Sequence, residues 1–268
     1  MGEFPLLVAT DLDGTIIRGD GTISERTVAA FARVEAAGAR FVLVTGRPPR
    51  VMRDIAAVFG HRGTAICANG ALAYDMRTGT IEALHVIPPP VLAAAAAALR
   101  AAVPGIGIAV EYPDGHAADD VYQAVNWGLD IARLGDAELF GRPASKLLGR
   151  HLSYTCDDLL ALAAPAIQDL VSVTHSNGKG LIEAAALGVS KATAVEELAA
   201  RHGIGCQSVL AFGDMPNDLP LLTWAGVSCA VGNAHPEVLV AATHVIGHND
   251  DDGVAEYLEK LFPQPRSG

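Results

Sequence analysis

The chain opens with a short apolar run that two aspartates follow at once. Residues 6–8 are typical of a strand buried on both faces, a kind that is common in parallel sheets. Asp11 and Asp13 come next, one residue apart, and Gly14 breaks the extended segment. Ligands of open parallel sheets bind just beyond the carboxyl ends of the strands. The pattern therefore predicts a buried first strand that carries two carboxylates to a place where chemistry is expected.

Strands and helices alternate in the first and the last third of the chain. Each predicted strand is a short apolar segment, and most predicted helices start at a capping residue or a proline. This rhythm predicts βαβ units and a parallel sheet. The predicted strands are residues 40–45, 64–70, 208–212 and 227–231, and the predicted helices are residues 25–37 after Ser24, 48–59, 191–201 after Ser190, a helix from Leu219, and 253–262 after Asp252.

The middle third of the chain has a less regular rhythm. Residues 71–87 predict a hairpin around Thr78 and Gly79, and strands and helices then follow in an uneven order to about residue 180. We interpret this part as an inserted α+β domain placed over the first domain. The expected boundaries are 1–82 for the first part of the core, 83–182 for the insertion and 183–268 for the second part of the core; within the insertion we predict strands 106–112, 146–154 and 171–175 and a helix over 157–170.

The charge of the chain argues against nucleic acid as a partner. With 30 acidic and 19 basic residues, the net charge is −11, whereas phosphate backbones require a basic surface. A small phosphorylated molecule stays compatible with this charge, because a bound metal ion can invert the local field.

The sequence also predicts a cytoplasmic protein that does not enter a membrane. Its longest apolar stretch, residues 91–99, ends at Arg100 and is far shorter than the about 20 residues that a bilayer requires. The first residues lack a basic region followed by an apolar block, so we expect no signal peptide. The four cysteines are scattered without a CxxC pair, which is typical of reduced thiols.

Four polar signals stand where the predicted strands end or a helix begins. The first is the pair Asp11 and Asp13, and the second is the sequence Thr45-Gly46-Arg47. Lys191 opens a helix, and the strand over 208–212 runs into the sequence GDMPND, with Asp214, Asn217 and Asp218. Each signal alone is an ordinary loop, but together they predict one active site at an edge of the sheet.

This set of side chains has the parts for phosphoryl transfer. Carboxylates that crowd together raise each other's pKa unless a divalent cation compensates their charge. Mg²⁺ suits such an oxygen-rich site, because it binds through carboxylates, water and phosphate oxygens. One carboxylate can then attack phosphorus to form an aspartyl-phosphate. Thr45, Lys191 and loop amides can hold the oxygens on which charge accumulates.

The motifs DLDGT, TGR and GDMPND, together with a lysine at a helix start, resemble the haloacid dehalogenase superfamily of phosphohydrolases. The insertion lies after CANGA (residues 67–71) and before SKATAVEEL (residues 190–198), and this position resembles the Cof-like subfamily IIB with its C2-type α/β cap. The resemblance implies an α/β fold, in which a Rossmann-like, doubly wound parallel-sheet core carries an inserted α+β cap domain. One departure is Ala192, where relatives usually have glycine.

The resemblance also implies a role for each motif residue. Asp11 would be the nucleophile, and Asp13 the general acid that protonates the leaving oxygen and then the base that activates water. Lys191 would neutralise the phosphoryl group and steady Asp11. Mg²⁺ would be bound by Asp11, Asp214 and the backbone carbonyl of Asp13. The remaining residues would bind the phosphoryl group or support the site: Thr45, Gly46, Arg47, Asn217 and, beside the metal, Asp218.

A carboxyl group at Asp13 fits phosphatases and phosphomutases of this superfamily, and hydrolysis is the commoner reaction in Cof-like proteins. We therefore predict a Mg²⁺-dependent phosphatase of a small phosphorylated metabolite, with a sugar phosphate as first choice. Pyridoxal phosphate or another small phosphate ester, a phosphomutase, and a non-catalytic ligand-binding protein on the same fold are the alternatives. Specificity is expected to come from the cap, where the candidates are Glu111, His116, His151 and His175; the oligomeric state stays open.

Overall fold

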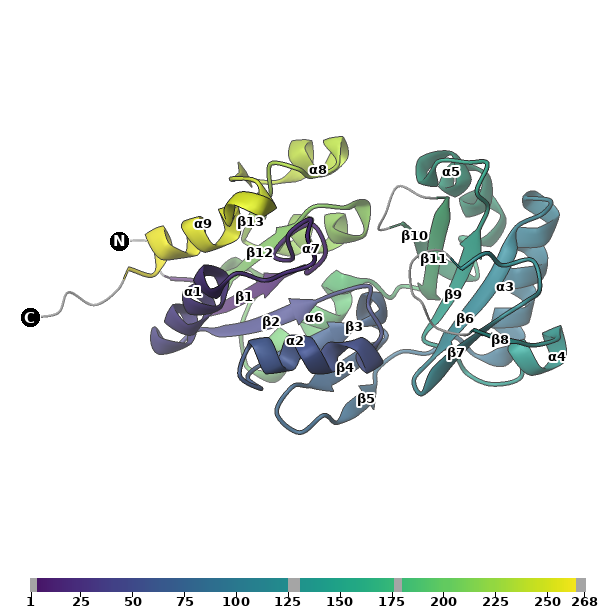
Figure 1. The fold of residues 1–268 in the computed structure, drawn as a ribbon, viewed down its shortest axis with the longest axis horizontal. Coiled ribbons are helices and arrows are strands. Elements are labelled where there is room, and N and C mark those ends of the chain that lie inside the picture. Colours follow the sequence, from purple (N-terminus) through teal and green to yellow (C-terminus); the bar gives the residue numbers. More distant parts are fainter. Residues whose placement is uncertain (1–3, 125–130, 176–179, 264–268) are drawn as a thin grey trace, which may run out of the picture.

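The computed structural model describes residues 4–124, 131–175 and 180–263, which form two sheets in two lobes (Figure 1). One sheet has eight strands in the order β14-β13-β12-β1-β2-β3-β4-β5. The other has six strands in the order β10-β11-β9-β6-β7-β8. We call the lobe with the eight-stranded sheet the core domain and the other lobe the cap domain.

The core sheet is parallel except at one edge. Its hairpin edge, β4 (Leu72–Asp75) and β5 (Ile81–Ala83), is antiparallel, as predicted around Thr78 and Gly79. The other six strands are parallel, and most of their residues are buried, which confirms the parallel sheet. They are β1 (Leu7–Thr10), β2 (Arg40–Val44), β3 (Thr64–Cys67), β12 (Val209–Gly213), β13 (Val227–Ala230) and β14 (His244–Val245).

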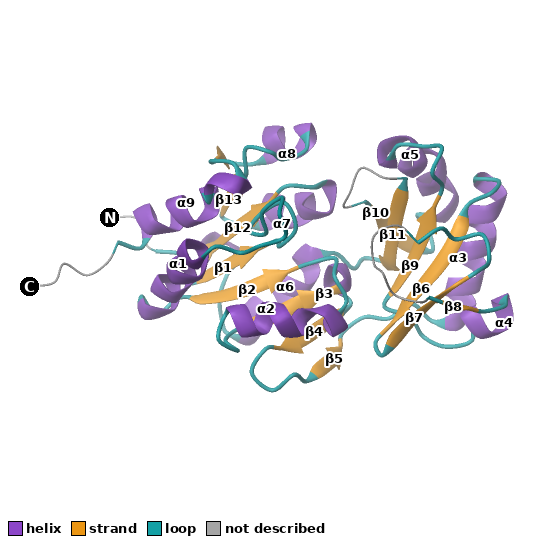
Figure 2. Cartoon of the chain, viewed as in Figure 1, coloured by secondary structure: helices purple, strands orange, loops and turns teal. Residues whose placement is uncertain are grey.

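Helices cover both faces of the core sheet (Figure 2). Ser24 and Ser190 cap α1 and α6 as predicted, each accepting a hydrogen bond from the backbone three residues on. In α1 the buried residues recur every three or four positions, so one face packs on the sheet. The core helices are α1 (Glu25–Ala36), α2 (Met52–Val58), α6 (Lys191–Arg201), α7 (Leu219–Trp224), α8 (Pro236–Ala241) and α9 (Gly253–Leu261), with 3-10 turns at Pro49–Val51, Ala68–Gly70, Cys206–Ser208, Pro216–Asp218 and Asn249–Asp251.

The predicted cap at Asp252 is wrong. This residue precedes α9 with a left-handed backbone (φ 60°), and its side chain makes no capping hydrogen bond. Its two carboxylate oxygens instead accept hydrogen bonds from Nε and Nη2 of Arg18, at 3.2 and 2.7 Å. A bidentate pair with a guanidinium is stronger than a single bond to a backbone amide, so Asp252 ties α9 to the loop that follows β1.

The cap sheet is antiparallel apart from the β7–β8 pair, and α3 and α5 pack on one of its faces. Ile108, Leu147 and Ile182 point to this side and belong to a hydrophobic core separate from that of the other lobe. The cap strands are β6 (Gly107–Tyr112), β7 (Gly115–Ala118), β8 (Ala132–Arg133), β9 (Lys146–Arg150), β10 (Val171–Thr174) and β11 (Leu181–Ala186), and its helices are α3 (Pro89–Ala102), α4 (Asp136–Leu139) and α5 (Cys156–Ile167).

The expected boundary between residues 182 and 183 falls inside β11. This strand pairs with β9 on one side and with β10 on the other as far as Ala186, so its whole length belongs to the cap sheet. We therefore place the proposed end of the cap after Ala186, before α6 begins.

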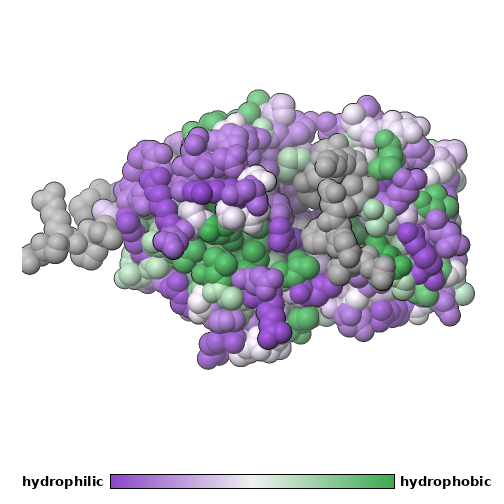
Figure 3. Space-filling model, viewed as in Figure 1, coloured by the Kyte–Doolittle hydropathy of each residue, from purple (hydrophilic) through white to green (hydrophobic). Residues whose placement is uncertain are grey.

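Within the described ranges, no helix is long and apolar enough to span a bilayer. The visible surface is mostly hydrophilic, with smaller hydrophobic areas (Figure 3). Three cysteines, Cys67, Cys156 and Cys229, are buried, and Cys206 is exposed. The cytoplasmic location stays a prediction.

Candidate active site

Three neighbouring strands bring the predicted motifs together. β12, β1 and β2 are adjacent and parallel, so the loops that follow them meet at one edge of the sheet. Asp11 follows β1, Thr45 follows β2 and Asp214 follows β12. Lys191, the first residue of α6, reaches the same edge. The structure therefore brings the four signals together at one edge of the sheet, and their role as an active site stays a prediction.

Lys191 is fully buried and links two aspartates that are far apart in the sequence. Its Nζ donates hydrogen bonds to Oδ1 of Asp11 and to Oδ1 of Asp218, both at 2.6 Å. These ion pairs raise the pKa of Lys191 despite its burial, so the amine stays charged. The lysine therefore fixes the orientation of Asp11 and compensates part of its charge.

Asp11, Asp214 and Asp218 form a buried acidic group. One oxygen of each carboxylate lies within 4.8 Å of one oxygen of each other. Burial is the largest cause that raises the pKa of Asp11 to about 7 and that of Asp214 to about 9; for Asp214 the charge of Asp11 adds to it. A set of oxygen donors whose charges are incompletely compensated fits a hard divalent cation such as Mg²⁺.

Asp218 also shapes the loop that carries Asp214. Its Oδ2 accepts hydrogen bonds from the backbone N–H groups of Asp214 and Met215, at 3.0 and 3.1 Å. With Oδ1 bound to Lys191, both oxygens of Asp218 have protein partners, which suits a supporting position beside a cation.

Gly14 allows the first loop to approach Asp214 closely. Its φ is +79°, and a Cβ added there would lie 2.3 Å from Oδ2 of Asp214. Thr15 donates a hydrogen bond from Oγ1 to Oδ1 of Asp214 at 3.1 Å. The glycine of the DLDGT motif is therefore required by both backbone conformation and space.

Asp13 stands apart from the acidic group. Its side chain is half exposed, and its carboxylate accepts two hydrogen bonds from Arg47, at 2.7 Å from Nε and 2.5 Å from Nη2. The acidic group of Asp11, Asp214 and Asp218 is defined by carboxylate oxygens alone. The predicted metal contact of the Asp13 backbone carbonyl therefore stays a prediction. The carboxylate of Asp13 faces the pocket between the two domains.

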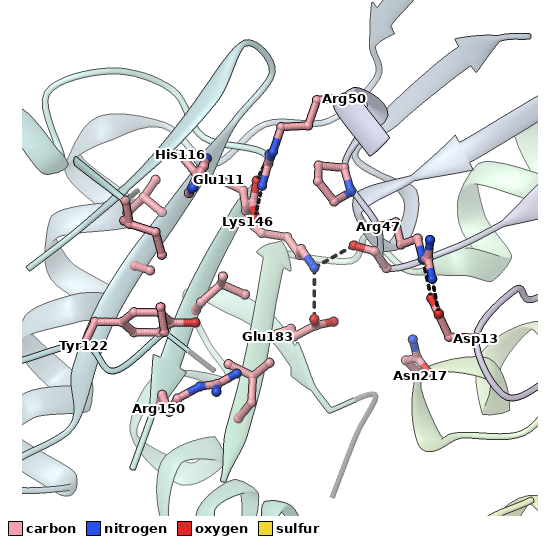
Figure 4. Close-up of a pocket in the computed structure, with 18 of the residues that line it drawn as sticks. Asp13, Arg47, Arg50, Glu111, His116, Tyr122, Lys146, Arg150, Glu183 and Asn217 are labelled. Atoms are coloured by element: carbon pink, nitrogen blue, oxygen red, sulfur yellow. Dashed lines mark hydrogen bonds and ion pairs between the residues drawn. The ribbon is translucent and has the colours of Figure 1, made fainter. Parts of the chain in front are cut away.

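This pocket has a volume of about 460 Å³ (Figure 4). Asp11, Asp13, Asp214 and Asn217 line it from the core, together with Gly46 and Arg47. Thr45 does not line it; this residue is buried, and its hydroxyl accepts a hydrogen bond from the N–H of Arg47 at 3.0 Å. The phosphate-binding role predicted for Thr45 stays a prediction, as does that of the fully buried Lys191, whereas Gly46, Arg47 and Asn217 do line the cavity.

The cap closes the pocket with alternate residues of its strands. Successive side chains of a strand point to opposite faces, so Lys146, Leu148 and Arg150 of β9 share the face opposite α3 and α5. Of the four cap candidates, Glu111 and His116 line the pocket, and His151 and His175 do not. The latter two contact other parts of the chain: His151 packs on Tyr154, and His175 lies 2.8 Å from Asp157.

Several residues that hold the cap over the core have no part in the predicted site. Asn69 donates from Nδ2 to Glu183 of the cap at 2.6 Å, and its Oδ1 accepts a hydrogen bond from Asn217 at 3.1 Å. Lys146 of the cap donates to the carbonyl of Gly46 at 2.8 Å and to Glu183 at 3.0 Å. In the sequence, the signal for these contacts is Asn69 itself, a polar residue directly after a buried strand of the core.

The predicted strand over 64–70 is shorter in the structure and ends at Cys67. Ala68 and Asn69 both have positive φ, 52° and 57°, so the chain turns directly after Cys67. This turn aims the side chain of Asn69 at the cap and at Asn217.

Two asparagines near the C-terminus support the first loop. Asn233 donates a hydrogen bond to the carbonyl of Gly14 at 2.7 Å, and Asn249 donates one to the carbonyl of Ile17 at 2.8 Å. These bonds fix the loop between β1 and α1 that carries Asp13 and Gly14.

Comparison with known proteins supports this architecture. A model of the haloacid dehalogenase-like hydrolases matches residues 8–111 and 136–258. The 5-amino-6-(5-phospho-D-ribitylamino)uracil phosphatase of Bacillus subtilis (strain 168) is 26% identical over 275 residues, which cover 96% of this chain and 98% of that protein. The pyridoxal phosphate phosphatase of Escherichia coli (strain K12) is 28% identical over 279 residues, which cover 94% and 97%.

A solved structure of a sugar phosphatase of subclass IIB of the same superfamily has the same fold. It superposes with a TM-score of 0.82 over 95% of this chain and 98% of that chain, at 19% sequence identity. The two ranges matched by the family model contain all the predicted site residues, from Asp11 to Asp218, and cover most of the chain. The chain therefore belongs to the haloacid dehalogenase-like hydrolases.

Proposed function

We propose that this phosphatase is Mg²⁺-dependent and transfers the phosphoryl group of a small metabolite first to Asp11 and then to water. The observation that carries the proposal is the buried contact of Asp11 with Lys191 at the base of a pocket that Asp11 itself lines. A carboxylate fixed by a buried cation beside a cavity for a small molecule is suited to attack on phosphorus.

In the first step, an oxygen of Asp11 bonds to phosphorus while the bond to the leaving oxygen breaks. Asp13 gives its proton to that oxygen, and in the second step it takes a proton from the water that attacks the aspartyl-phosphate. Its half-exposed carboxylate at the pocket wall supports this role. Lys191 holds Asp11 in place, and the loop that begins at Thr45 binds the phosphoryl oxygens.

Asp11, Asp214 and the backbone carbonyl of Asp13 would hold the Mg²⁺ ion, with Asp218 beside it. When bound, the ion supplies positive charge to the phosphate and to the carboxylates that face it. The donor set supports this assignment, because oxygen ligands with raised pKa values gain most from a divalent cation.

A sugar phosphate is our first choice of substrate, and the pocket volume suits a molecule of that size. The relatives named above act on a ribitylaminouracil phosphate and on pyridoxal phosphate, so another small phosphate ester is the second choice. A phosphomutase, which would pass the phosphoryl group to a second sugar, and a non-catalytic ligand-binding protein would fit the same fold.

The test is hydrolysis of p-nitrophenyl phosphate with and without the metal. We expect activity with Mg²⁺, a loss of at least about a hundredfold in excess EDTA, and recovery when Mg²⁺ is added back. Activity that persists unchanged in EDTA would overturn the metal dependence. Transfer of the phosphoryl group to a second sugar instead of water would favour the mutase.

A second measurement uses the pKa values of the acidic group. Both Asp11 (about 7) and Asp214 (about 9) lie far above the about 3.9 of an unfolded aspartate. The metal-free folded protein therefore keeps protons that the unfolded chain releases. The stability that this difference confers is complete below about pH 4 and is lost as the pH rises through both values. Because a cation replaces these protons, the rise in Tm caused by Mg²⁺ should grow from about pH 6 to about pH 9.

Thermal unfolding in EDTA and in MgCl₂ across this pH range measures the effect. In Asp214→Asn, the rise in Tm caused by Mg²⁺ should increase much less with pH, since one of the two proton-binding carboxylates is gone. A shift of equal size at every pH would contradict the assignment of these carboxylates to the cation.

A further inference from the structure

Arg150, the last residue of β9, is a buried cation at the cap end of the pocket, and it has no ion-pair partner among the described residues. The residue is 6% exposed, and it lines the cavity. Its Nε and Nη1 atoms are buried and have no hydrogen-bond partner within the described ranges. Its nearest compensation is the ring of Tyr122, whose centroid lies 5.6 Å from the guanidinium carbon. A cation–π contact at this distance is weak compared with an ion pair.

The other three basic residues that line the pocket, apart from histidine, are already paired within the described chain. Arg47 binds Asp13, Arg50 binds Glu111, and Lys146 binds Glu183. Figure 4 shows these three contacts as dashed lines and none from Arg150. Glu111 and Glu183, the carboxylates that line the pocket from the cap in the described part of the chain, are therefore engaged with other cations and form no ion pair with Arg150.

Among the described residues, the apolar walls beside Arg150 do not supply an ion-pair partner. Ala109, Leu148 and Ile131 line this end of the pocket with apolar surface and pack together with Tyr122. His116 adds no strong positive charge, because burial and the nearby Arg50 lower its pKa. Leaving a guanidinium buried without hydrogen bonds is unfavourable, so a site that keeps one is built to receive an anion from outside the chain.

The position of Arg150 along β9 sets the distance from the reacting group. Lys146 lies at the start of β9, where it contacts the loop of Gly46 beside the catalytic edge. Arg150 is four residues further on, about 13 Å along an extended strand. A ligand that reaches both ends must therefore carry its second polar group several bonds away from the phosphate that is transferred.

We propose that Arg150 determines the specificity of this enzyme by pairing with a second anionic group, a carboxylate or a second phosphate, at the far end of the substrate. The planar guanidinium offers two parallel N–H donors, which match both kinds of anion. The inference rests on the proposed phosphatase function and narrows its substrate class from phosphate monoesters to those with two anionic ends.

The test compares matched substrates that differ in the second group. One arm pairs 6-phosphogluconate with glucose 6-phosphate, and the other pairs glucose 1,6-bisphosphate with glucose 6-phosphate. We expect the wild type to favour the doubly anionic member of at least one pair by about 10- to 100-fold in kcat/KM, the range that a charge-assisted hydrogen bond gives. The arm that shows the preference identifies the anion as carboxylate or phosphate.

Variants then assign the preference to Arg150. In Arg150→Met, the ratio of kcat/KM between the doubly and the singly anionic substrate should fall close to one. Arg150→Lys should keep part of the preference, because lysine retains the charge but lacks the planar guanidinium. Arg142→Met is the matched control: this cap arginine stacks on Tyr112, outside the pocket, and its loss should leave the ratio at the wild-type value.

Stability provides a readout that does not depend on turnover. Removal of an unpaired buried charge should leave the Tm of the ligand-free Arg150→Met protein unchanged or raise it. A fall of more than about 4 °C would mean that Arg150 has a structural role and would overturn the proposal. So would a wild type that hydrolyses phosphate esters without any preference, or a preference that survives Arg150→Met. A wild type that hydrolyses none of the esters, p-nitrophenyl phosphate included, would overturn the proposed function itself.

Discussion

Asp11→Asn is expected to lower kcat for p-nitrophenyl phosphate by more than about a thousandfold, the scale seen when a nucleophile is removed. A carboxamide cannot attack phosphorus, and the other aspartates of the described pocket lining already have partners: Arg47 binds Asp13, and Thr15 binds Asp214. The protein should remain folded, because Lys191 keeps Asp218 as a partner and the acidic group loses one of its crowded charges. A steady-state assay with Mg²⁺ present, together with a thermal unfolding curve, measures both effects.

The control for this prediction is Asp54→Asn. Asp54 is an exposed aspartate of α2 outside the pocket, so its variant should match the wild type in kcat. The intermediate can be sought directly: borohydride reduces an aspartyl-phosphate to homoserine, and the wild type quenched during turnover should carry homoserine at position 11. Turnover that survives Asp11→Asn, or homoserine at another aspartate, would refute the nucleophile assignment.

The strands and the motif residues could be predicted because the signals are local. An apolar run that ends in Asp-x-Asp-Gly needs only its neighbours to be interpreted, and alternating strands and helices predict a parallel sheet. The order β12-β1-β2 within that sheet was not predicted and comes from the structure. The family and the phosphatase class were predicted from the same motifs, and the family model together with the named relatives confirms them.

Cap elements were predicted less well, because their ends depend on contacts outside the local pattern. The predicted strand over 146–154 stops at Arg150, after which His151 and Ser153 form a turn in which His151 Nδ1 accepts the backbone N–H of Ser153. The predicted helix over 157–170 begins one residue earlier, where Thr155 accepts a hydrogen bond from the N–H of Asp158, and it ends at Ile167. The capping residue Thr155 is a local signal in the sequence, whereas no local signal marks the end of the strand at Arg150.

The contacts between the domains could not be predicted from the sequence. Asn69 binds Glu183, 114 residues away, and Lys146 reaches the carbonyl of Gly46, 100 residues away. These partners meet only because the cap sheet turns one face toward the core. The burial of Arg150 could not be predicted either: an arginine at a strand end is ordinarily solvated, and only the folded structure shows that this one lies buried in the wall of the pocket.

The largest effect on stability is expected from Lys191→Met. The amine is fully buried between Asp11 and Asp218, and methionine keeps most of the volume without the charge. Removing one partner of a buried ion pair leaves uncompensated carboxylates, which costs about 3–5 kcal/mol of unfolding free energy. Activity should fall by at least about a hundredfold, because Asp11 loses the group that orients it.

The pH dependence of this loss separates a charge effect from a packing effect. Because the folded protein raises the pKa of Lys191 above the about 10.4 of the unfolded amine, the amine stays charged over the whole range from about pH 5 to about pH 9. In Lys191→Met the orphaned carboxylates can bind protons at low pH, so the destabilisation should be smaller near pH 5 than near pH 8. Urea unfolding at both pH values measures the difference, with Lys260→Met, an exposed lysine on α9, as the control.

A double variant completes the argument. The double variant Lys191→Met with Asp11→Asn has lost one of the two carboxylate charges that the lysine compensated. It should therefore be more stable than Lys191→Met alone, although it stays inactive. Such non-additivity is expected only if Lys191 and Asp11 act through their direct contact. Additive losses of stability, or Lys191→Met with wild-type activity, would mean that the buried lysine merely fills space and that another group orients the nucleophile.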